Sequence, residues 1–517
     1  MKNRKLIKNV SLPVFSGILG VLAFPPFELS FLGWFCLVPL LIVVKEETPK
    51  RSFCYGCISG MVFFIGLIYW LVNVTYPGTF FLIIVLSVFY GIFGLIANLV
   101  MRNSIDLMIL PFVWVVLEYI RSHLFGGFPW GLLGYSQYQN LLLIQISDFT
   151  GPYGVSFLLA VISIGIFSFL KRIRKFKTHM VVAFMFLFLF TSYGVYKLKN
   201  NSMWSSLRIS VVQGNIEQQL KWDDAFAEDI VNKYEKLTVK AAKMHPDLIV
   251  WPETSYPYLV QNLSSDVKAI KDLSRENKIS ILSGFVSERD NVFYNSALLF
   301  DEKGESDKIY NKIHLVPFGE YIPFESFLSF LREFIDKPIG KFVKGTDYTL
   351  FQINSVKLLD LSGGARSRKT SFHKFGVLIC FEDIFPYISR RFVKNGADFL
   401  VNITNDAWFG RTPGARQHLQ SSVFRAVENR VPLIRAANTG ISCFIDSRGK
   451  ILSVVSEDNE EIFISGISTV DVNFGRRGSF YTFYGDVFIY LSIFIIGLFV
   501  ALEKVYIKKR KNQAKKG

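Results

Sequence analysis

The sequence has few residues of the kinds that bind metals or form disulfides. Its 517 residues include five cysteines and six histidines, and the histidines lack the spacing typical of metal ligands. Cys54 and Cys57 form a CxxC pair that stands alone at one end of an apolar run, which disfavours a redox or metal role. Internal repeats and low-complexity linkers are also lacking, apart from a Lys-rich C-terminal tail. We therefore expect no metal and no organic cofactor.

Charged residues are also scarce, at 19 % of the chain, whereas half of the residues are hydrophobic and 51 are Phe. This composition is typical of a membrane protein that carries a soluble domain. A membrane-spanning helix needs about 20 apolar residues. On that criterion we predict a bundle of about eight transmembrane helices, at Lys8–Phe24, Phe31–Val44, Cys54–Val74, Thr79–Val100, Leu107–Ile120, Gly154–Leu170, Met180–Tyr196 and Val487–Leu502.

The N-terminus resembles a signal peptide, with Lys and Arg ahead of an apolar run, but it lacks a cleavage site. Phe24-Pro-Pro stands where small residues would be required, so a retained signal-anchor is expected.

The net charge of +16 is confined to one side of the predicted membrane. With an intracellular N-terminus and eight spans, the inside segments hold 20 Lys and Arg against 4 Asp and Glu, and 20 − 4 gives the whole +16. This is the positive-inside pattern, so the basic residues set the orientation and meet anionic lipid headgroups. Nucleic-acid binding is excluded. Both termini are predicted to be cytoplasmic and the large soluble segment to lie on the outer face, which in a bacterium means the periplasm or the outer surface of the cytoplasmic membrane.

Three domains are expected: a membrane domain at 1–199 with seven transmembrane helices, an extracytoplasmic domain at 200–485, and an eighth helix with a basic tail at 486–517. Short apolar runs alternate with polar helices from Leu207 onward, which indicates a mixed α/β sandwich. Expected strands include Asp247–Trp251, Phe375–Cys380 and Phe399–Thr404, while Leu361–Lys374 is expected to be a loop. Two helices are predicted at Asp223–His245 and Ala415–Asn429.

Three strand-like runs end in reactive side chains. Glu253 follows Trp251-Pro, Lys312 lies in Tyr-Asn-Lys-Ile-His-Leu-Val-Pro-Phe-Gly-Glu-Tyr, and Cys380 precedes Phe-Glu-Asp. A Cys nucleophile reacts as a thiolate and needs a base or a positive environment. Glu253 can act as the base, and Lys312 can stabilise a thiolate and an oxyanion. Taken singly, each has an ordinary structural alternative: a packed core Cys, a capping Glu and a solvated Lys.

Together these segments resemble the Glu-Lys-Cys triad of the nitrilase superfamily, and the surrounding spans narrow the resemblance to the membrane-integrated apolipoprotein N-acyltransferase family. Further matching segments are Gln213-Gly-Asn-Ile, Lys221-Trp-Asp, Asn405-Asp-Ala-Trp-Phe-Gly and Gln417-His-Leu.

The resemblance implies a nitrilase-like αββα sandwich inserted in the helix bundle. It implies Glu253 as general base, Lys312 as stabilising cation and Cys380 as nucleophile. It also implies supporting or substrate-binding positions, at Glu320, Trp222, Pro323, Phe381 and Glu382. Phe381 is a departure, because members of the family often have Tyr after the Cys, and the role of that hydroxyl is in doubt here.

The family's reaction is ping-pong. An acyl chain passes from the sn-1 position of a phospholipid, with phosphatidylethanolamine as the expected donor, to the Cys and then to the α-amine of diacylglyceryl-cysteine in diacylated apolipoproteins. Arg121–Tyr153 is expected either to cover the lipid access route or to form an ordinary aromatic belt. Pro323–Ile335 is expected to be a membrane-dipping lid rather than core. Two alternatives stay open: a membrane-tethered amidase or nitrilase, and a transporter. A transporter would require ionisable residues in the spans, and the spans have essentially none apart from Glu118 near one end.

Overall fold

The computed structural model describes residues 2–103, 105–200, 203–262, 265–317, 319–321, 342–360, 366–475 and 477–514. The chain forms two compact units. The first comprises Met1–Tyr69, Pro77–Lys199 and Tyr484–Gly517, and the second comprises Trp70–Tyr76 and Asn200–Phe483.

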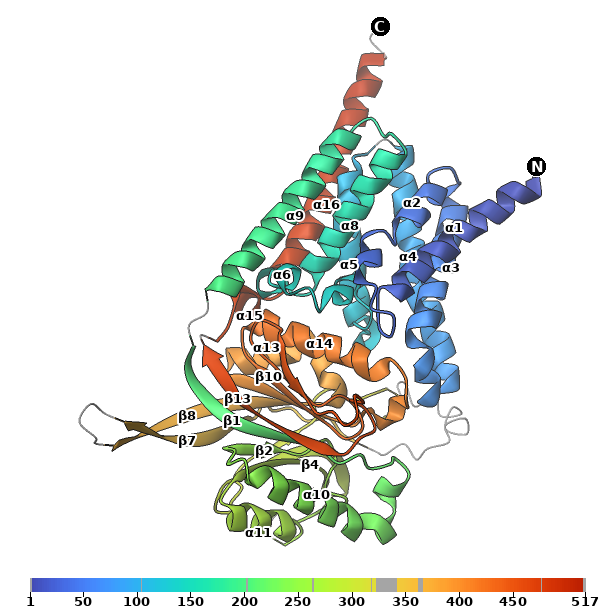
Figure 1. The fold of residues 1–517 in the computed structure, drawn as a ribbon. Helices are drawn as coiled ribbons and strands as arrows, with labels where there is room; N and C mark the ends of the chain where they lie inside the picture. The colour runs from blue at the N-terminus through green and yellow to red at the C-terminus, as the bar shows by residue number, and fades with distance from the viewer. Residues whose placement is uncertain are drawn as a thin grey trace. The chain divides into compact units, whose positions relative to one another are not determined.

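The first unit consists of helices (Figure 1). Its α-helices are α1 (Lys2–Leu22), α2 (Val38–Val44), α3 (Pro49–Ile68), α4 (Tyr76–Arg102), α5 (Leu110–His123), α6 (Leu141–Ile144), α7 (Ser147–Thr150), α8 (Tyr153–Leu170), α9 (Phe176–Lys199) and α16 (Val487–Ala514). Every predicted span overlaps a helix, although Phe31–Val44 is divided into a 3-10 helix and the short α2. Five helical segments of the described chain are long and apolar enough to cross a membrane: Pro49–Asn73, Tyr76–Arg102, Leu107–Gly126, Tyr153–Leu170 and Phe176–Lys199. The remaining predicted spans are shorter apolar helices, so the number of eight is not confirmed.

Small residues bring α3 and α4 into close contact. A Cβ atom at Gly56 would lie 2.2 Å from the carbonyl oxygen of Tyr90, and one at Gly91 would lie 2.5 Å from the sulfur of Cys57. Any larger side chain would force the helices apart. Contacts of this kind hold helices together in lipid, where burial of apolar surface contributes little.

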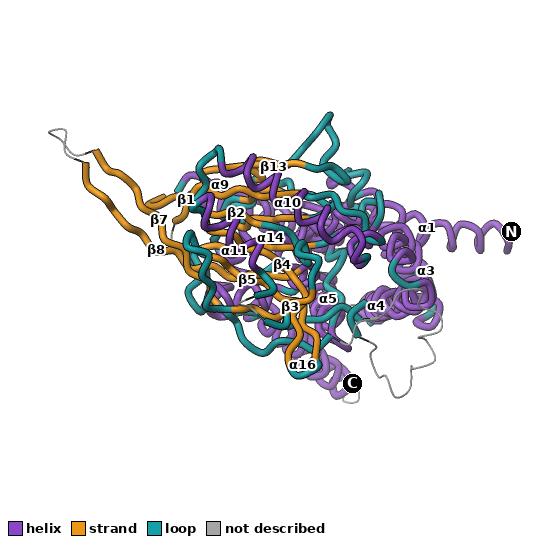
Figure 2. Tube along the Cα trace, turned by 90° about the horizontal axis from the view of Figure 1, so that it is seen from below, coloured by secondary structure: helices purple, strands orange, loops and turns teal. Residues whose placement is uncertain are grey.

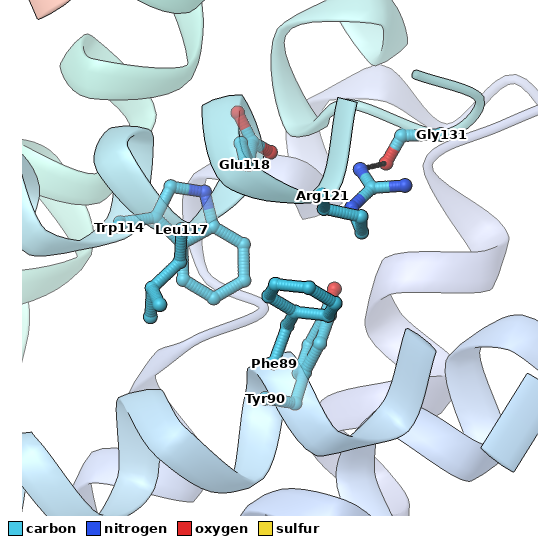
Figure 3. A pocket seen from close by; sticks show the side chains of 7 residues that line it. All are labelled: Phe89, Tyr90, Trp114, Leu117, Glu118, Arg121 and Gly131. Atoms are coloured by element: carbon cyan, nitrogen blue, oxygen red, sulfur yellow. Dashed lines mark hydrogen bonds between the residues drawn. The ribbon is translucent and has the colours of Figure 1, made fainter. Parts of the chain in front are cut away.

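A pair of ionisable residues is buried in this unit, on α5. Glu118 accepts the N–H of Leu133 at 2.8 Å, and Arg121 donates to the carbonyl oxygens of Phe128 and Trp130. Figure 3 shows both side chains at a small cavity lined also by residues of α4. Arg121 therefore ties the segment after α5 to the helix, and the cavity contains none of the predicted catalytic residues.

The aromatic residues of Arg121–Tyr153 divide between the interior and the surface of the first unit. Trp130, Tyr135 and Tyr138 are buried, and Tyr138 donates to Glu28 at 2.7 Å, whereas Phe125 is exposed. The three buried side chains are therefore packing residues rather than parts of an aromatic belt.

The second unit is built around two sheets that face each other. One sheet has the order β13-β1-β2-β4-β5-β6, with β3 paired to β4, and the other has the order β12-β11-β10-β9-β8-β7. The strands of the first are β1 (Met203–Gln213), β2 (Leu248–Val250), β3 (Leu259–Val260), β4 (Ser280–Arg289), β5 (Val292–Phe300), β6 (Ile309–Asn311) and β13 (Gly466–Gly475). Those of the second are β7 (Leu350–Asp360), β8 (Arg366–Ile379), β9 (Phe399–Thr404), β10 (Leu433–Ala437), β11 (Cys443–Ile445) and β12 (Ile451–Val454).

Helices cover the outer face of each sheet (Figure 1). α10 (Ala227–Ala242) and α11 (Lys268–Asn277) pack on the first sheet, and α13 (Pro386–Lys394) and α14 (Gly414–Asn429) pack on the second. On α10, Tyr234 is buried and its ring stacks on Trp251 with centroids 4.9 Å apart. The layers are therefore α, β, β, α, as the resemblance implied.

Parallel pairing buries the strands that lead to the predicted site. β9 pairs in parallel with β8 and β10, and all of its residues are buried, as are those of β2. Parallel strands covered on both faces carry continuous apolar runs, which explains the sequence pattern at these strands.

The prediction that Leu361–Lys374 is a loop is wrong for its described part. β8 begins at Arg366 and pairs antiparallel with β7, from Asp360 opposite Arg366 to Leu350 opposite Gly376. Figure 2 shows the two strands as a ribbon that reaches beyond the other strands. The part of the ribbon that was expected to be a loop, from Arg366 to Lys374, is polar and basic, so it lacks the apolar alternation on which strand prediction depends.

Candidate active site

The nucleophile candidate stands where β8 stops and a short 3-10 helix, η9 (Cys380–Ile384), begins. Cys380 has a backbone φ of +53°, a conformation uncommon outside glycine that is found at functional sites. The side-chain amide of Asn402 on β9 donates to the carbonyl oxygens of Leu378 and Cys380, at 3.0 and 3.1 Å. The neighbouring parallel strand thereby holds the turn.

Glu253 is positioned by β2 and by a glycine on β4. It follows β2 after Trp251 and Pro252, and it is 6 % exposed. A Cβ atom at Gly284 would lie 2.8 Å from the Cα atom of Glu253, so the glycine allows this close approach. The amide of Asn295 donates to Glu253 Oε1 at 2.7 Å and fixes the carboxylate.

Lys312 directly follows β6 and is 1 % exposed. Its Nζ lies 3.0 Å from Glu320 Oε1 and 3.6 Å from Glu253 Oε1. Burial lowers the pKa of Lys312, but the negative charges of Glu320 and Glu253 raise it more, so the net shift is upward. The side chain is therefore a permanent cation between two carboxylates.

Glu320 completes this cluster. Its Oε2 accepts the N–H of Val316 at 2.8 Å, and its Oε1 accepts from Asn295 at 3.0 Å. Asn295 thus binds both carboxylates, a role that its sequence context did not indicate.

The pKa of the Cys380 thiol is raised above its ordinary value of 9.0. Burial contributes most and the charge of Glu253 adds to it, while Lys312 opposes the shift. The resting group is therefore a thiol, which must lose its proton to a base before it can attack. Glu253 and Lys312 are the charged groups that act most strongly on it.

Glu382 is buried beneath the nucleophile turn and accepts several hydrogen bonds. Its donors are the backbone N–H groups of Ile379, Ile313 and His314 and the hydroxyl of Tyr310. Burial raises its pKa to about 7, against the effect of these N–H groups. Glu382 is therefore hydrogen-bonded both to the residue before Cys380 and to the residue after Lys312.

Phe381 lies among aromatic side chains. Its ring centroid is 5.1 Å from that of Phe385 and 6.1 Å from that of His314. Burial, followed by the charge of Lys312, lowers the pKa of His314 to about 4, so this histidine is neutral at pH 7.

For two of the predicted supporting positions, Trp222 and Pro323, no side-chain contacts are described. Trp222 ends the 3-10 helix η6 (Leu220–Trp222), but its side chain is outside the described part. Pro323 and the whole predicted lid at Pro323–Ile335 lie outside the described residues.

A buried charge cluster below η9 was missed by sequence reasoning. Arg435 on β10 lies 3.1 Å from Asp383 and 2.9 Å from Asp406, and His418 on α14 lies between the same two carboxylates, at 2.7 and 3.0 Å. Arg435 also donates to Asn402, the residue that holds the Cys380 carbonyl. The only signal was the polar character of Asn405-Asp-Ala-Trp and Gln417-His-Leu.

Comparison with known proteins matches both units. Residues 16–165 match the apolipoprotein N-acyltransferase N-terminal domain, and residues 208–479 match the carbon-nitrogen hydrolase family. An apolipoprotein N-acyltransferase of Geobacter metallireducens is 38 % identical over 94 % of this chain and 93 % of its own length. The chain belongs to the apolipoprotein N-acyltransferase family. Relatives of that name in Pasteurella multocida and Treponema denticola are 31 % and 30 % identical, over 96 % and 98 % of this chain and 95 % and 99 % of their own lengths.

Membership in this family confirms the resemblance and the nitrilase-like fold. The long apolar helices identify a membrane protein, and the apolipoprotein N-acyltransferase relatives named above are bacterial. The amidase and transporter alternatives are disfavoured, because the match to apolipoprotein N-acyltransferases spans both units rather than the hydrolase-like unit alone.

Proposed function

We propose that this protein transfers an acyl chain from a phospholipid to the N-terminal amine of a diacylglyceryl-cysteine in an apolipoprotein, through a thioester on Cys380. The observation that carries the proposal is the buried cluster of Glu253, Lys312 and Glu320 beside the nucleophile turn. Membership in a family of membrane-integrated acyltransferases supplies the substrate class.

In the first half-reaction Glu253 takes the proton of the Cys380 thiol, and the thiolate attacks the carbonyl carbon of the sn-1 ester. A C–S bond forms and the ester C–O bond breaks. The proton held by Glu253 passes to the departing glycerol oxygen, which leaves as a lysophospholipid. Such proton transfer contributes roughly 10²- to 10⁴-fold to a rate.

In the second half-reaction the α-amine of the acceptor attacks the thioester. A C–N bond forms, the C–S bond breaks, and Glu253 receives the proton that the amine loses. That proton returns to the Cys380 sulfur, so the enzyme ends as it began. The products are an amide and a free thiol, and no oxidant, metal or cofactor takes part.

Lys312 is proposed to stabilise negative charge in both steps. A buried ammonium that is already placed beside Glu253 and Glu320 needs no reorganisation when an oxyanion forms. Glu320 and Asn295 keep the ammonium and the base in position. Trp222, Pro323, Phe381 and Glu382 remain proposed supporting or substrate-binding positions.

The proposed setting is the bacterial inner membrane, with the acyl donor expected to be phosphatidylethanolamine. Both termini are proposed to be cytoplasmic, with the catalytic domain at 200–485 periplasmic and the flanking segments 1–199 and 486–517 in the membrane. The distribution of Lys and Arg along the sequence supports this orientation.

The test is a transfer assay with the detergent-solubilised full chain, a phospholipid labelled in its sn-1 chain and a diacylglyceryl-cysteine peptide. We expect labelled amide from the wild type, and a loss of roughly 10²-fold or more with Glu253→Gln or Lys312→Met. Cleavage of soluble amides without any labelled peptide would support the amidase alternative and overturn the proposal.

A further inference from the structure

A second lysine lies in the same buried region as the proposed triad. Lys221, in η6, is 3 % exposed. Its Nζ donates to the backbone carbonyl oxygen of Glu253 at 2.8 Å. In the sequence, Lys221 is part of the Lys-Trp-Asp segment, whose pattern indicates no role for the lysine.

Burying a lysine is unfavourable unless its charge is compensated. Burial lowers the pKa of Lys221 to about 8, while the negative charges of Glu253 and of an ionised Cys380 raise it. Lys221 is therefore in electrostatic contact with both partners of the proposed proton transfer, and it is still largely protonated at pH 7.

Within the group of contacts that joins Lys312, Lys221, Glu253 and Glu320, the positive and negative charges are equal in number only when Lys221 is included. Lys312 and Lys221 carry two positive charges, and Glu253 and Glu320 carry two negative charges. Moving the proton from Cys380 to Glu253 shifts one negative charge to sulfur and leaves the sum at zero. Without Lys221 the other three side chains and the proton shared by Cys380 and Glu253 would carry a net charge of −1, which disfavours ionisation of the thiol.

We propose that Lys221 is a positioning residue of the active site, which holds the backbone of Glu253 and makes ionisation of Cys380 possible by balancing the charge of the site. This inference rests on the proposed function, because it assigns Lys221 to the same proton transfer. It adds a second cation beside Lys312, on a different element of the fold.

The test is the pH dependence of Cys380 alkylation by iodoacetamide, followed by mass spectrometry of the Cys380 peptide in the full chain. The charged groups that act most on this thiol are Glu253, Lys312 and Asp406, and an ionised Cys380 in turn acts on Lys221. For Lys221→Met we expect the alkylation midpoint to rise by about 1 pH unit and the rate at pH 7.5 to fall about tenfold. Lys221→Arg, which keeps the charge, should restore the midpoint toward that of the wild type.

Lys240→Met is the matched control, because Lys240 is exposed on α10. It should leave both the midpoint and the rate unchanged. If Lys221→Met lowers thermal stability without moving the midpoint, Lys221 is a structural residue and the inference is wrong. If Lys221→Met does not fold, Lys221→Gln and Lys221→Arg replace it, and the same midpoint for these two variants would equally contradict the inference.

The outcome is separable from that of the proposed function. Alkylation needs no lipid, so an unshifted midpoint in a protein whose wild type forms the acyl adduct would overturn the role of Lys221 alone. A wild type that forms no adduct would overturn the proposed function instead.

Discussion

The carboxylate of Glu382 accepts the backbone N–H of Ile313 at 2.6 Å. It also accepts the N–H of Ile379 at 2.7 Å. These two residues immediately precede and follow the proposed chemistry: Ile379 comes before Cys380, and Ile313 comes after Lys312. One buried carboxylate thus links the turn that carries the nucleophile to the loop that carries the cation.

Glu382 should make stability depend on pH. Its pKa rises from 4.5 to about 7 on folding, so the folded state retains a proton that the unfolded chain releases. The contribution of Glu382 to the free energy of unfolding is fully present below pH 4.5. It falls by about 3 kcal/mol as the pH rises to 7. Glu382→Gln should flatten this slope in thermal unfolding at pH 5 and pH 7.5, whereas Glu302→Gln, at an exposed position, should not. An equal pH dependence of stability in both variants would contradict the raised pKa of Glu382.

Asn295 should matter because a single amide binds both carboxylates of the site, at 2.7 and 3.0 Å. Asn295→Ala removes this constraint and is expected to lower kcat/KM roughly 10- to 100-fold. The nearly isosteric Asn295→Asp should be worse, because a third negative charge beside Glu253 and Glu320 would repel the first two. Steady-state transfer assays on the two variants give the comparison, and wild-type activity in Asn295→Asp would be inconsistent with this geometry.

Arg435 should be needed for stability rather than for chemistry alone. Its guanidinium compensates Asp383 and Asp406 in the interior, and removing one partner of such a cluster costs about 3–5 kcal/mol. We expect this loss for Arg435→Gln in denaturant unfolding. The matched variant Arg411→Gln, whose side chain is 62 % exposed, should change stability by less than about 0.5 kcal/mol. Similar effects of the two substitutions would show that the cluster is not stabilising.

Phe381 should tolerate a hydroxyl. Phe381 is half-buried and packs against Phe385 and His314. Its contribution to the transfer rate is therefore expected to come from the packing of its ring. Phe381→Tyr should keep the transfer rate within about threefold, and Phe381→Ala should lower it about tenfold. A large gain of activity in Phe381→Tyr would instead show that the hydroxyl has a catalytic role that this chain lacks.

Much of the site follows from the sequence because the chemistry lies at strand ends. Glu253 and Cys380 each follow an apolar run, and parallel strands with buried faces produce such runs. Helices α10 and α14 lie within the two ranges for which the residue spacing and composition predict helices. The α/β layering follows from the alternation of these elements.

Other features depend on pairings between distant residues and could not be predicted. β13 joins β1 from more than 250 residues away, and Arg435 finds its partners on four other elements. Lys221 is unremarkable in sequence because only the fold shows that it is buried. The segment Trp70–Tyr76, most of which lies within the predicted span Cys54–Val74, belongs to the second unit, where Trp70 donates to Gln417 at 3.1 Å. No local pattern specifies such contacts.

The most direct measurement is intact-protein mass spectrometry after incubation with a phospholipid of defined sn-1 chain, with the wild type and Cys380→Ala side by side. The wild type should gain the mass of one acyl group and lose it on treatment with neutral hydroxylamine, as a thioester does. Cys380→Ala should gain nothing. An adduct that persists in Cys380→Ala, or a wild type that never acquires one, would contradict a thioester on Cys380.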